Sequence, residues 1–250
     1  MKKIIELTDT KDKEKMVEFY RNMLLEDGEL GEQVTNYLTN IKCISKKTLE
    51  HFNVGAGERW IYKDNEWVKL YCYVLFCSMQ PFSYIFKPIS QLKLNLDKKF
   101  IYGGRLNFLG DKNIKIQNRN SSTLCDIDIS NKVIISESFF DMMSIYDIKK
   151  KDNDYATGCL NSNINIEKIV NDIVSNDIMR NKEYYIIFNN NTLSINKAQE
   201  LYDELNSLNF SVKNITEDVF RKTFSKYTNC NEILTEDKKK LQRRIYRFIK

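Results

Sequence analysis

The sequence has very little of three residue types that often build sites or turns, with two prolines, eight glycines and one histidine in 250 residues. Its six cysteines form no C-x-x-C pair. One histidine and unpaired cysteines cannot supply the usual tetrahedral ligand set, so we expect no structural zinc site. Scattered cysteines without a signal peptide instead predict reduced, buried thiols in a cytoplasmic protein.

Long hydrophobic runs and a strong charge of one sign are also absent. The most apolar stretch, residues 70–76, has the length of a strand and not the about 20 residues that cross a membrane, so we expect no membrane partner. The net charge of +5 permits a nucleic-acid partner without requiring one. The length allows one large domain or two small ones.

The first part of the chain predicts helices followed by strands. Apolar residues recur at helical spacing over 11–27 and again over 30–38. Ser45 is a good N-cap for a short third helix, which we expect to stop at Gly55 and Gly57. Aromatic and β-branched residues then predict strands from 59 to 89, with a hairpin turn at 63–66.

From residue 131 onward the pattern alternates between strand and helix. Short apolar runs predict strands at 133–136, 155–157, 184–188 and 210–215, with amphipathic helices between them. This alternation is typical of a mostly parallel sheet covered by helices. A last helix over about 235–249 carries many lysines and arginines.

The predicted architecture is therefore an α+β N-terminal subdomain followed by a Rossmann-like α/β subdomain. We place the first at 1–130, the second at 131–236 and a basic C-terminal helix at 237–250. The border near residue 130 has no linker rich in proline or glycine, so we expect the two subdomains to pack together.

Polar residues follow two of the predicted strands. Glu137 comes directly after strand 133–136, and Asp141 follows at the start of the next helix. Strand 184–188 ends instead in three asparagines, 189 to 191. Open α/β sheets present their chemistry at such strand ends. Two carboxylates at this spacing can share a metal ion or divide acid and base roles.

The order and spacing of several short motifs resemble the RNA-polymerase core of bacterial DnaG-type primases. In the front half these are Tyr-Leu at 37–38, Lys-Cys-Ile-Ser at 42–45, where the family has an arginine and a glycine before the isoleucine, and Phe-Asn-Val-Gly at 52–55. In the back half, residues 134–141, 157–160, 185–191 and 229–234 are similar to the motifs of a TOPRIM domain. We find no counterpart of the family's zinc-binding and helicase-binding domains.

The resemblance implies a metal site that this chain has largely lost. The family gathers six acidic residues at the strand ends, and only Glu137 and Asp141 remain as catalytic and metal-binding candidates. The other four metal positions hold amides: Asn189, Asn191, Asn229 and Asn231. Because this exchange removes four negative charges, we expect Mg²⁺ or Mn²⁺ to bind weakly at best.

Basic residues supply the candidate nucleic-acid contacts. In the front half these are Lys42, Lys98, Lys99 and Arg105. In the last helix they are Lys238, Lys239, Arg243, Arg244 and Arg247, and aromatic residues interleave with them. The alternative is a solvated helix whose charges suit its dipole. The expected partner is single-stranded DNA or an RNA–DNA hybrid.

The sequence therefore predicts a primase-like replication protein in the cytoplasm of a bacterium or a phage-infected cell. We expect it to be weak or inactive in primer synthesis and to act by binding DNA, a helicase or another replication protein. One alternative is an active primase or TOPRIM nuclease that uses one metal ion on Glu137 and Asp141. Another is a structural or inhibitory interaction protein of a phage or mobile element.

Overall fold

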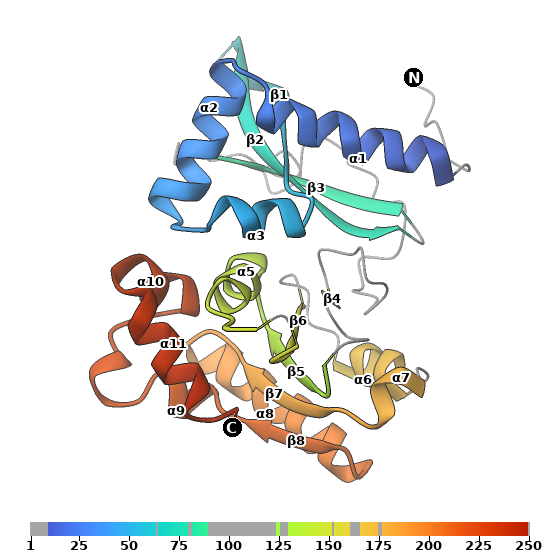
Figure 1. The fold of residues 1–250 in the computed structure, drawn as a ribbon, viewed down its shortest axis with the longest axis vertical. Helices are drawn as coiled ribbons and strands as arrows, with labels where there is room; N and C mark the ends of the chain where they lie inside the picture. Colours follow the sequence, from blue (N-terminus) through green and yellow to red (C-terminus); the bar gives the residue numbers. More distant parts are fainter. Residues whose placement is uncertain are drawn as a thin grey trace.

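The computed structural model describes residues 10–63, 65–79, 82–89, 124–125, 130–151, 153–160, 166–174 and 177–249. The positions predicted at Lys98, Lys99 and Arg105 lie outside these ranges. Figure 1 shows two parts, one above the other. We call residues 10–89 the front part and residues 124–249 the back part.

The front part is an antiparallel sheet with helices packed against it, as the sequence predicted. The sheet has the strand order β1-β2-β3. Its elements are α1 (Thr10–Leu25), α2 (Glu29–Asn36), the π-helical turn η1 (Tyr37–Ile41), α3 (Lys46–His51), β1 (Gly55–Lys63), β2 (Glu66–Met79) and β3 (Phe82–Pro88). The predicted N-cap is confirmed, because the Ser45 side chain accepts a hydrogen bond from the Thr48 N–H.

Two glycines do not end the third helix, contrary to the prediction. Helix α3 ends at His51, and Gly55 and Gly57 lie inside β1. A Cβ at Gly55 would lie 2.7 Å from the backbone of Tyr20 in α1, and one at Gly57 would lie 2.6 Å from the Phe86 ring. These glycines therefore allow α1 and β3 to approach the strand closely, which periodicity along the chain cannot reveal.

The backbone of Cys43 is in the left-handed region, with φ 56°. This conformation costs a non-glycine residue roughly 1–2 kcal/mol, and the greater freedom of glycine in the unfolded chain offsets part of that cost. We expect Cys43→Gly to raise the free energy of unfolding by about 1 kcal/mol in urea titrations. Cys43→Ala keeps the strain and serves as the control, so an equal gain in both variants would contradict this explanation.

The back part is built on a five-stranded sheet in the order β4-β6-β5-β7-β8. Strands β6, β5, β7 and β8 are parallel, while β4 pairs antiparallel with β6 at one edge. This confirms the predicted α/β architecture. The strands are β4 (Leu124–Cys125), β5 (Lys132–Ser136), β6 (Ala156–Cys159), β7 (Glu183–Ile187) and β8 (Ser211–Asn214).

Helices lie on both faces of this sheet (Figure 1). Helix α5 follows β5 and faces the front part, whereas α6 and α8 share an apolar cluster with the opposite face of the sheet. The helices are α5 (Phe139–Asp147), α6 (Ile166–Val174), α7 (Asp177–Arg180), α8 (Thr192–Ser207), α9 (Thr216–Val219), the 3-10 turn η2 (Lys222–Phe224), α10 (Cys230–Glu236) and α11 (Lys238–Tyr246). Among the described residues, no helix is long and apolar enough to span a membrane.

The prediction of one last helix over about 235–249 is wrong, because the chain breaks at Asp237. This residue has φ −161° and ψ 107°, and its side chain accepts hydrogen bonds from the N–H groups of Lys239 and Lys240. Asp237 thus ends α10 and caps α11. The apolar residues Leu241 and Ile245 of α11 are fully buried, so this basic helix packs into the back part.

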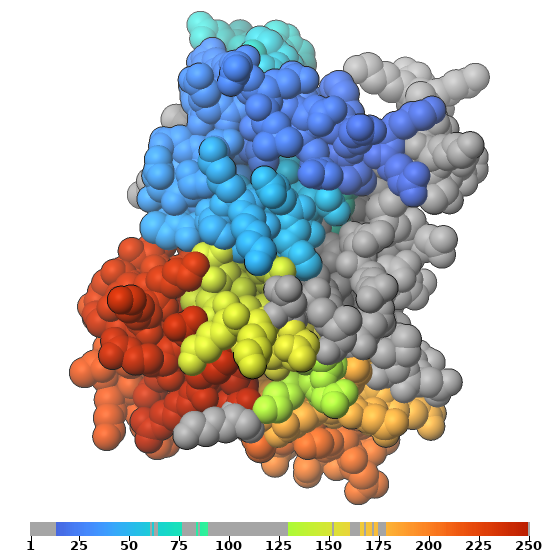
Figure 2. Space-filling view, in the orientation of Figure 1, coloured from blue at the N-terminus to red at the C-terminus, as the bar shows by residue number. Residues whose placement is uncertain are grey.

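One apolar core runs through the contact between the two parts. Leu49 and Phe52 of the front part belong to the same buried cluster as Met142 and Tyr146 of α5. His51 stacks on Tyr146 with ring centroids 4.2 Å apart. Figure 2 shows the atoms of the front part lying directly on those of α5. The predicted packing of the two subdomains is therefore present.

Candidate functional site

The ends of β5 and β7 bring Glu137 and Asn189 together. These strands are parallel neighbours, with Ser136 in register with Ile187. The N–H of Asn189 donates a hydrogen bond of 3.2 Å to Oε2 of Glu137. The Oδ1 atom of Asn189 is buried and has no hydrogen-bond partner among the described residues. Glu137 therefore joins the two strand ends through a backbone contact.

Asp141 lies in the first turn of α5 and is almost fully buried. Its side chain is 3 % exposed. Ser138, where the primase family has a glycine, caps α5 by accepting from the Asp141 N–H, and its hydroxyl donates to Oδ2 of Asp141 over 2.6 Å. The Asn231 N–H donates to Oδ1 over 3.1 Å. Burial raises the pKa of Asp141 to about 6, although these hydrogen bonds act in the opposite direction.

Asn231 connects three segments of the chain. It is 5 % exposed, and its Nδ2 donates to the Lys42 carbonyl and to Oγ of Ser144, both over 2.9 Å. With its backbone bond to Asp141, the residue therefore joins α10, α5 and the front part. An amide performs this role because it supplies two donors, whereas a carboxylate supplies none.

Two other asparagines cap helices. Oδ1 of Asn191 accepts from the Ser194 N–H at the start of α8, and Oδ1 of Asn229 accepts from the Glu232 N–H at the start of α10, both over 3.0 Å. Asparagine is among the preferred N-cap residues. The neighbouring Asn190, not singled out from the sequence, donates through Nδ2 to the carbonyls of Ser225 and Tyr227.

The six matched positions do not form a set of donors suited to two metal ions. The two carboxylates accept hydrogen bonds from protein groups, and the Oδ1 atoms of Asn191 and Asn229 serve as helix caps. Among the described residues, no group of three or more His, Cys, Asp or Glu side chains gathers in one place. A Mg²⁺ pair needs several carboxylates. The residues present therefore do not fit a two-metal centre.

The buried carboxyl of Asp141 predicts a specific pH dependence. Its folded-state pKa of about 6 lies above the ordinary 3.8, so its favourable contribution is fully present below about pH 4 and is lost as the pH rises through 6. We expect the free-energy gap between the wild type and Asp141→Asn to change by about 2 kcal/mol between pH 4.5 and 7, with the wild type losing stability relative to the variant as the pH rises. Urea unfolding at several pH values measures this gap, and a gap that stays constant would contradict it.

The predicted nucleic-acid contacts that the structure describes occupy four different environments. Lys42 lies beside the site, with its carbonyl bound to Asn231 and its Nζ 4.9 Å from the centre of the Phe140 ring. Lys238 forms an ion pair with Asp147 over 2.9 Å. Lys239 lies exposed in the first turn of α11. Of the predicted contacts that the structure describes, Arg243 and Arg244 of α11 and Arg247 at its C-cap line one cavity.

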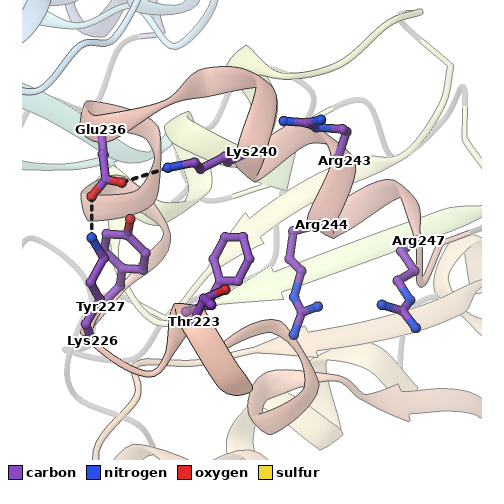
Figure 3. A pocket seen from close by; sticks show the side chains of 9 residues that line it. Thr223, Lys226, Tyr227, Glu236, Lys240, Arg243, Arg244 and Arg247 are labelled. Carbon is purple, nitrogen blue, oxygen red and sulfur yellow. Dashed lines mark hydrogen bonds and ion pairs between the residues drawn. The ribbon is translucent and has the colours of Figure 1, made fainter.

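This cavity is lined by six residues that the sequence pattern does not single out, Thr223 and Glu236 among them. It lies between α11 and the turn at 223–227, has a volume of about 640 Å³, and is also lined by Lys226, Lys240, Phe224 and Tyr227 (Figure 3). We call it the basic groove. The interleaved aromatic and basic residues at 224–227 are a sequence signal for a nucleic-acid contact of this kind. The fold was needed to show that they face α11.

The sequence matches no protein-family model, and no curated protein is similar to it. Solved structures resemble the fold. The RNA-polymerase domain of Mycobacterium tuberculosis DnaG, in complex with a double-stranded DNA oligomer with a 6-nucleotide overhang, is 10% identical with a TM-score of 0.60, and the match covers 95% of this chain and 79% of that one.

Two further structures agree with the first. The Aquifex aeolicus primase, comprising zinc-binding and RNA-polymerase domains, is 13% identical with a TM-score of 0.59, and the match covers 98% of this chain and 63% of that one. A DnaG catalytic core is 8% identical with a TM-score of 0.59, and the match covers 95% and 79% of the two chains. The chain thus has the fold of the DnaG-type primase catalytic core, with a TOPRIM-like α/β subdomain.

Proposed function

We propose that the chain is a primase-like replication protein that binds nucleic acid and makes little or no RNA primer. The observation that carries this proposal is the set of structural roles held by the asparagines. Asn191 and Asn229 cap helices, and Asn231 joins the two parts of the molecule. These positions are thus used for folding where the resemblance implies metal ligands.

The proposed loss of primer synthesis follows from the charge of the site. Nucleotidyl transfer needs divalent cations to neutralise the charge that develops on the phosphates. Here one carboxylate is buried with a raised pKa and the other bonds a backbone N–H. We therefore propose that Mg²⁺ or Mn²⁺ binds weakly or not at all. Glu137 and Asp141 then maintain the strand ends and do not catalyse.

The proposed nucleic-acid contact is supported by the basic groove and by Lys42. Five cationic side chains line the groove with one carboxylate among them. A strand-end site with two carboxylates also repels a phosphate backbone less than a cluster of six unoccupied carboxylates would. Similar primase cores have been solved with DNA, including one described as bound to single-stranded DNA. We propose a single strand or an RNA–DNA hybrid as the ligand, in the cytoplasm of a bacterium or an infected cell.

A primer-synthesis assay tests the catalytic half of this proposal. The purified chain is incubated with a single-stranded template, ribonucleotides and Mg²⁺ or Mn²⁺, beside Glu137→Gln. We expect no primer above the level of the variant. Abundant primer that disappears in Glu137→Gln would overturn the proposal in favour of an active enzyme that uses one metal ion. Binding of a labelled single strand tests the other half, and a complete lack of salt-dependent binding would contradict it.

A further inference from the structure

The described lining of the basic groove has an excess of positive charge. Its lining carries five cations and one carboxylate, Glu236. This carboxylate is bound by two lysines, Lys226 and Lys240, each over 2.8 Å. Hydrogen bonds from these lysines lower the pKa of Glu236 to about 2. Among the residues that the structure describes, no other acid lines the groove, so Arg243, Arg244 and Arg247 face it without a carboxylate of its lining to balance them.

One of these arginines is held in place by the protein. Arg244 donates through Nε to the Val219 carbonyl over 2.9 Å and through its guanidinium to the Asp218 carbonyl. Its guanidinium carbon lies 4.9 Å from the centre of the Phe224 ring. Burial lowers the pKa of Arg244, and the nearby charge of Arg247 lowers it further. Arg244 is therefore a rigid wall of the groove.

The other two arginines are available to a ligand. Arg243 and Arg247 are exposed, and only Arg243 has a hydrogen bond that the structure records for its side chain, at 3.3 Å to the Lys239 carbonyl. In Figure 3 the guanidinium groups of Arg244 and Arg247 extend in the same direction from the C-terminal end of α11, while that of Arg243 extends toward the side of Lys240. Guanidinium groups are well suited to the oxygens of phosphate, which they bind in pairs of hydrogen bonds.

We propose that the basic groove is a phosphate-binding site for a nucleotide unit, contacted directly by Arg243 and Arg247 and positioned by Arg244. Its volume of about 640 Å³ lies within the range of small-molecule sites, about 300–1,000 Å³. Two adjacent phosphate groups of a nucleic-acid strand can interact with several of the cations in the groove. The single carboxylate of the groove cannot neutralise them all. The same chemistry occurs in a single strand and in a free nucleoside triphosphate.

The groove is also coupled to the strand ends of the TOPRIM-like sheet. Asn190 donates to the carbonyls of Ser225 and Tyr227 over 3.2 and 3.0 Å, and its N–H donates to the Thr228 carbonyl over 2.7 Å. One wall of the groove is thus fixed by the residue between Asn189 and Asn191. This inference deepens the proposed nucleic-acid contact. It rests on the proposed function where it names a single strand as the ligand.

The test measures binding of three probes in EDTA: a labelled oligo-dT, ATP and inorganic tripolyphosphate. The variant Arg243→Gln/Arg247→Gln removes two exposed charges from the groove. The control Lys197→Gln/Lys213→Gln removes the same charge from α8 and β8, outside the groove. We expect the groove variant to weaken oligo-dT binding and to reduce the slope of log K against log salt by about 1.4, at about 0.7 per phosphate contact. The control should match the wild type.

A variant that is expected to strengthen phosphate binding excludes the explanation that substitutions only disturb the structure of the groove. Glu236→Gln removes the one carboxylate and releases Lys226 and Lys240, so we expect it to tighten phosphate binding several-fold. If oligo-dT binds the wild type and the groove variant equally, the groove inference is overturned and the proposed function stands. If only ATP and tripolyphosphate bind, and Arg243→Gln/Arg247→Gln abolishes this, the groove holds a free nucleotide and the proposed strand contact fails. If no probe binds the wild type, both fail.

Discussion

Asn231→Asp should destabilise the chain by roughly 3 kcal/mol, one of the two largest effects that we expect from a single substitution. The amide donates to the Lys42 carbonyl and to Oγ of Ser144, and a carboxylate cannot donate to either. The change also places a second acid beside the buried Asp141, whose Oδ1 accepts from the backbone N–H of residue 231. Urea unfolding at pH 7 in EDTA measures the loss without any compensation by metal ions.

The same chemical change at two other asparagines is the matched control. Asn191→Asp and Asn229→Asp keep the oxygen that accepts the helix N–H, and a negative charge at a helix N-terminus is favourable. We expect each to alter the free energy of unfolding by about 0.5 kcal/mol or less. Equal effects at 191, 229 and 231 would show that the Asn231 network does not hold the two parts together.

This contrast bears on the asparagines at positions that the resemblance matches to metal ligands. Acids could return at 191 and 229 with little cost, but an acid at 231 would break a buried network that joins α10, α5 and the front part. Asn231, at a position that the resemblance matches to a metal ligand, is thus part of the buried core. Restoring the acidic residues would require a new arrangement of the Lys42 carbonyl and the Ser144 hydroxyl.

The second large effect is expected at Asp147, the last residue of α5. Its side chain is 2 % exposed. Its Oδ1 accepts from both hydroxyls at the start of α3, those of Ser45 and Thr48, and from the Ser45 N–H over 3.3 Å, while Oδ2 pairs with Lys238. Asp147→Ala would remove the acceptor for all of these donors. We expect a loss of about 3 kcal/mol in the free energy of unfolding.

Lys238→Ala removes the ion pair at Oδ2 of Asp147 and leaves the hydrogen bonds from α3 to Oδ1 in place. The lysine is half exposed, and exposed ion pairs contribute about 0–1 kcal/mol. We expect its removal to cost less than about 1 kcal/mol, because the bonds from Asp147 to α3 persist. Hydrogen exchange should report faster opening of α3 in Asp147→Ala and unchanged protection in Lys238→Ala. If Asp147→Ala and Lys238→Ala lower the free energy of unfolding equally, the hydrogen bonds between Asp147 and the start of α3 are not the source of the lost stability.

The sequence predicted the elements whose signals are local. Alternating strand and helix patterns identified the parallel sheet, and Ser45 was recognised as an N-cap because the cap and its helix are adjacent. Parallel strands end at one edge, so the approach of Glu137 to Asn189 could also be anticipated. The resemblance to primase cores rested on such short motifs in the right order.

Other features depend on contacts between distant segments. The sequence pattern predicts a helix stop at Gly55 and Gly57, but α1 and β3 require these glycines inside a strand. The break at Asp237 is not visible in the run of basic residues that follows it. The roles of Asn231 and Asn190 depend on partners that are at least 35 residues away in sequence. The basic groove needs α11 to fold back on the turn at 223–227, which composition alone cannot indicate.

Direct titration with Mn²⁺ tests the central claim that the strand-end residues do not hold catalytic metal. Electron paramagnetic resonance counts free Mn²⁺ as it is added to the wild type and to Glu137→Gln. We predict no saturable site tighter than about 1 mM, equivalent to about −4 kcal/mol, and the same curve for both proteins. Two Mn²⁺ ions bound at micromolar concentration in the wild type and lost in Glu137→Gln would contradict it.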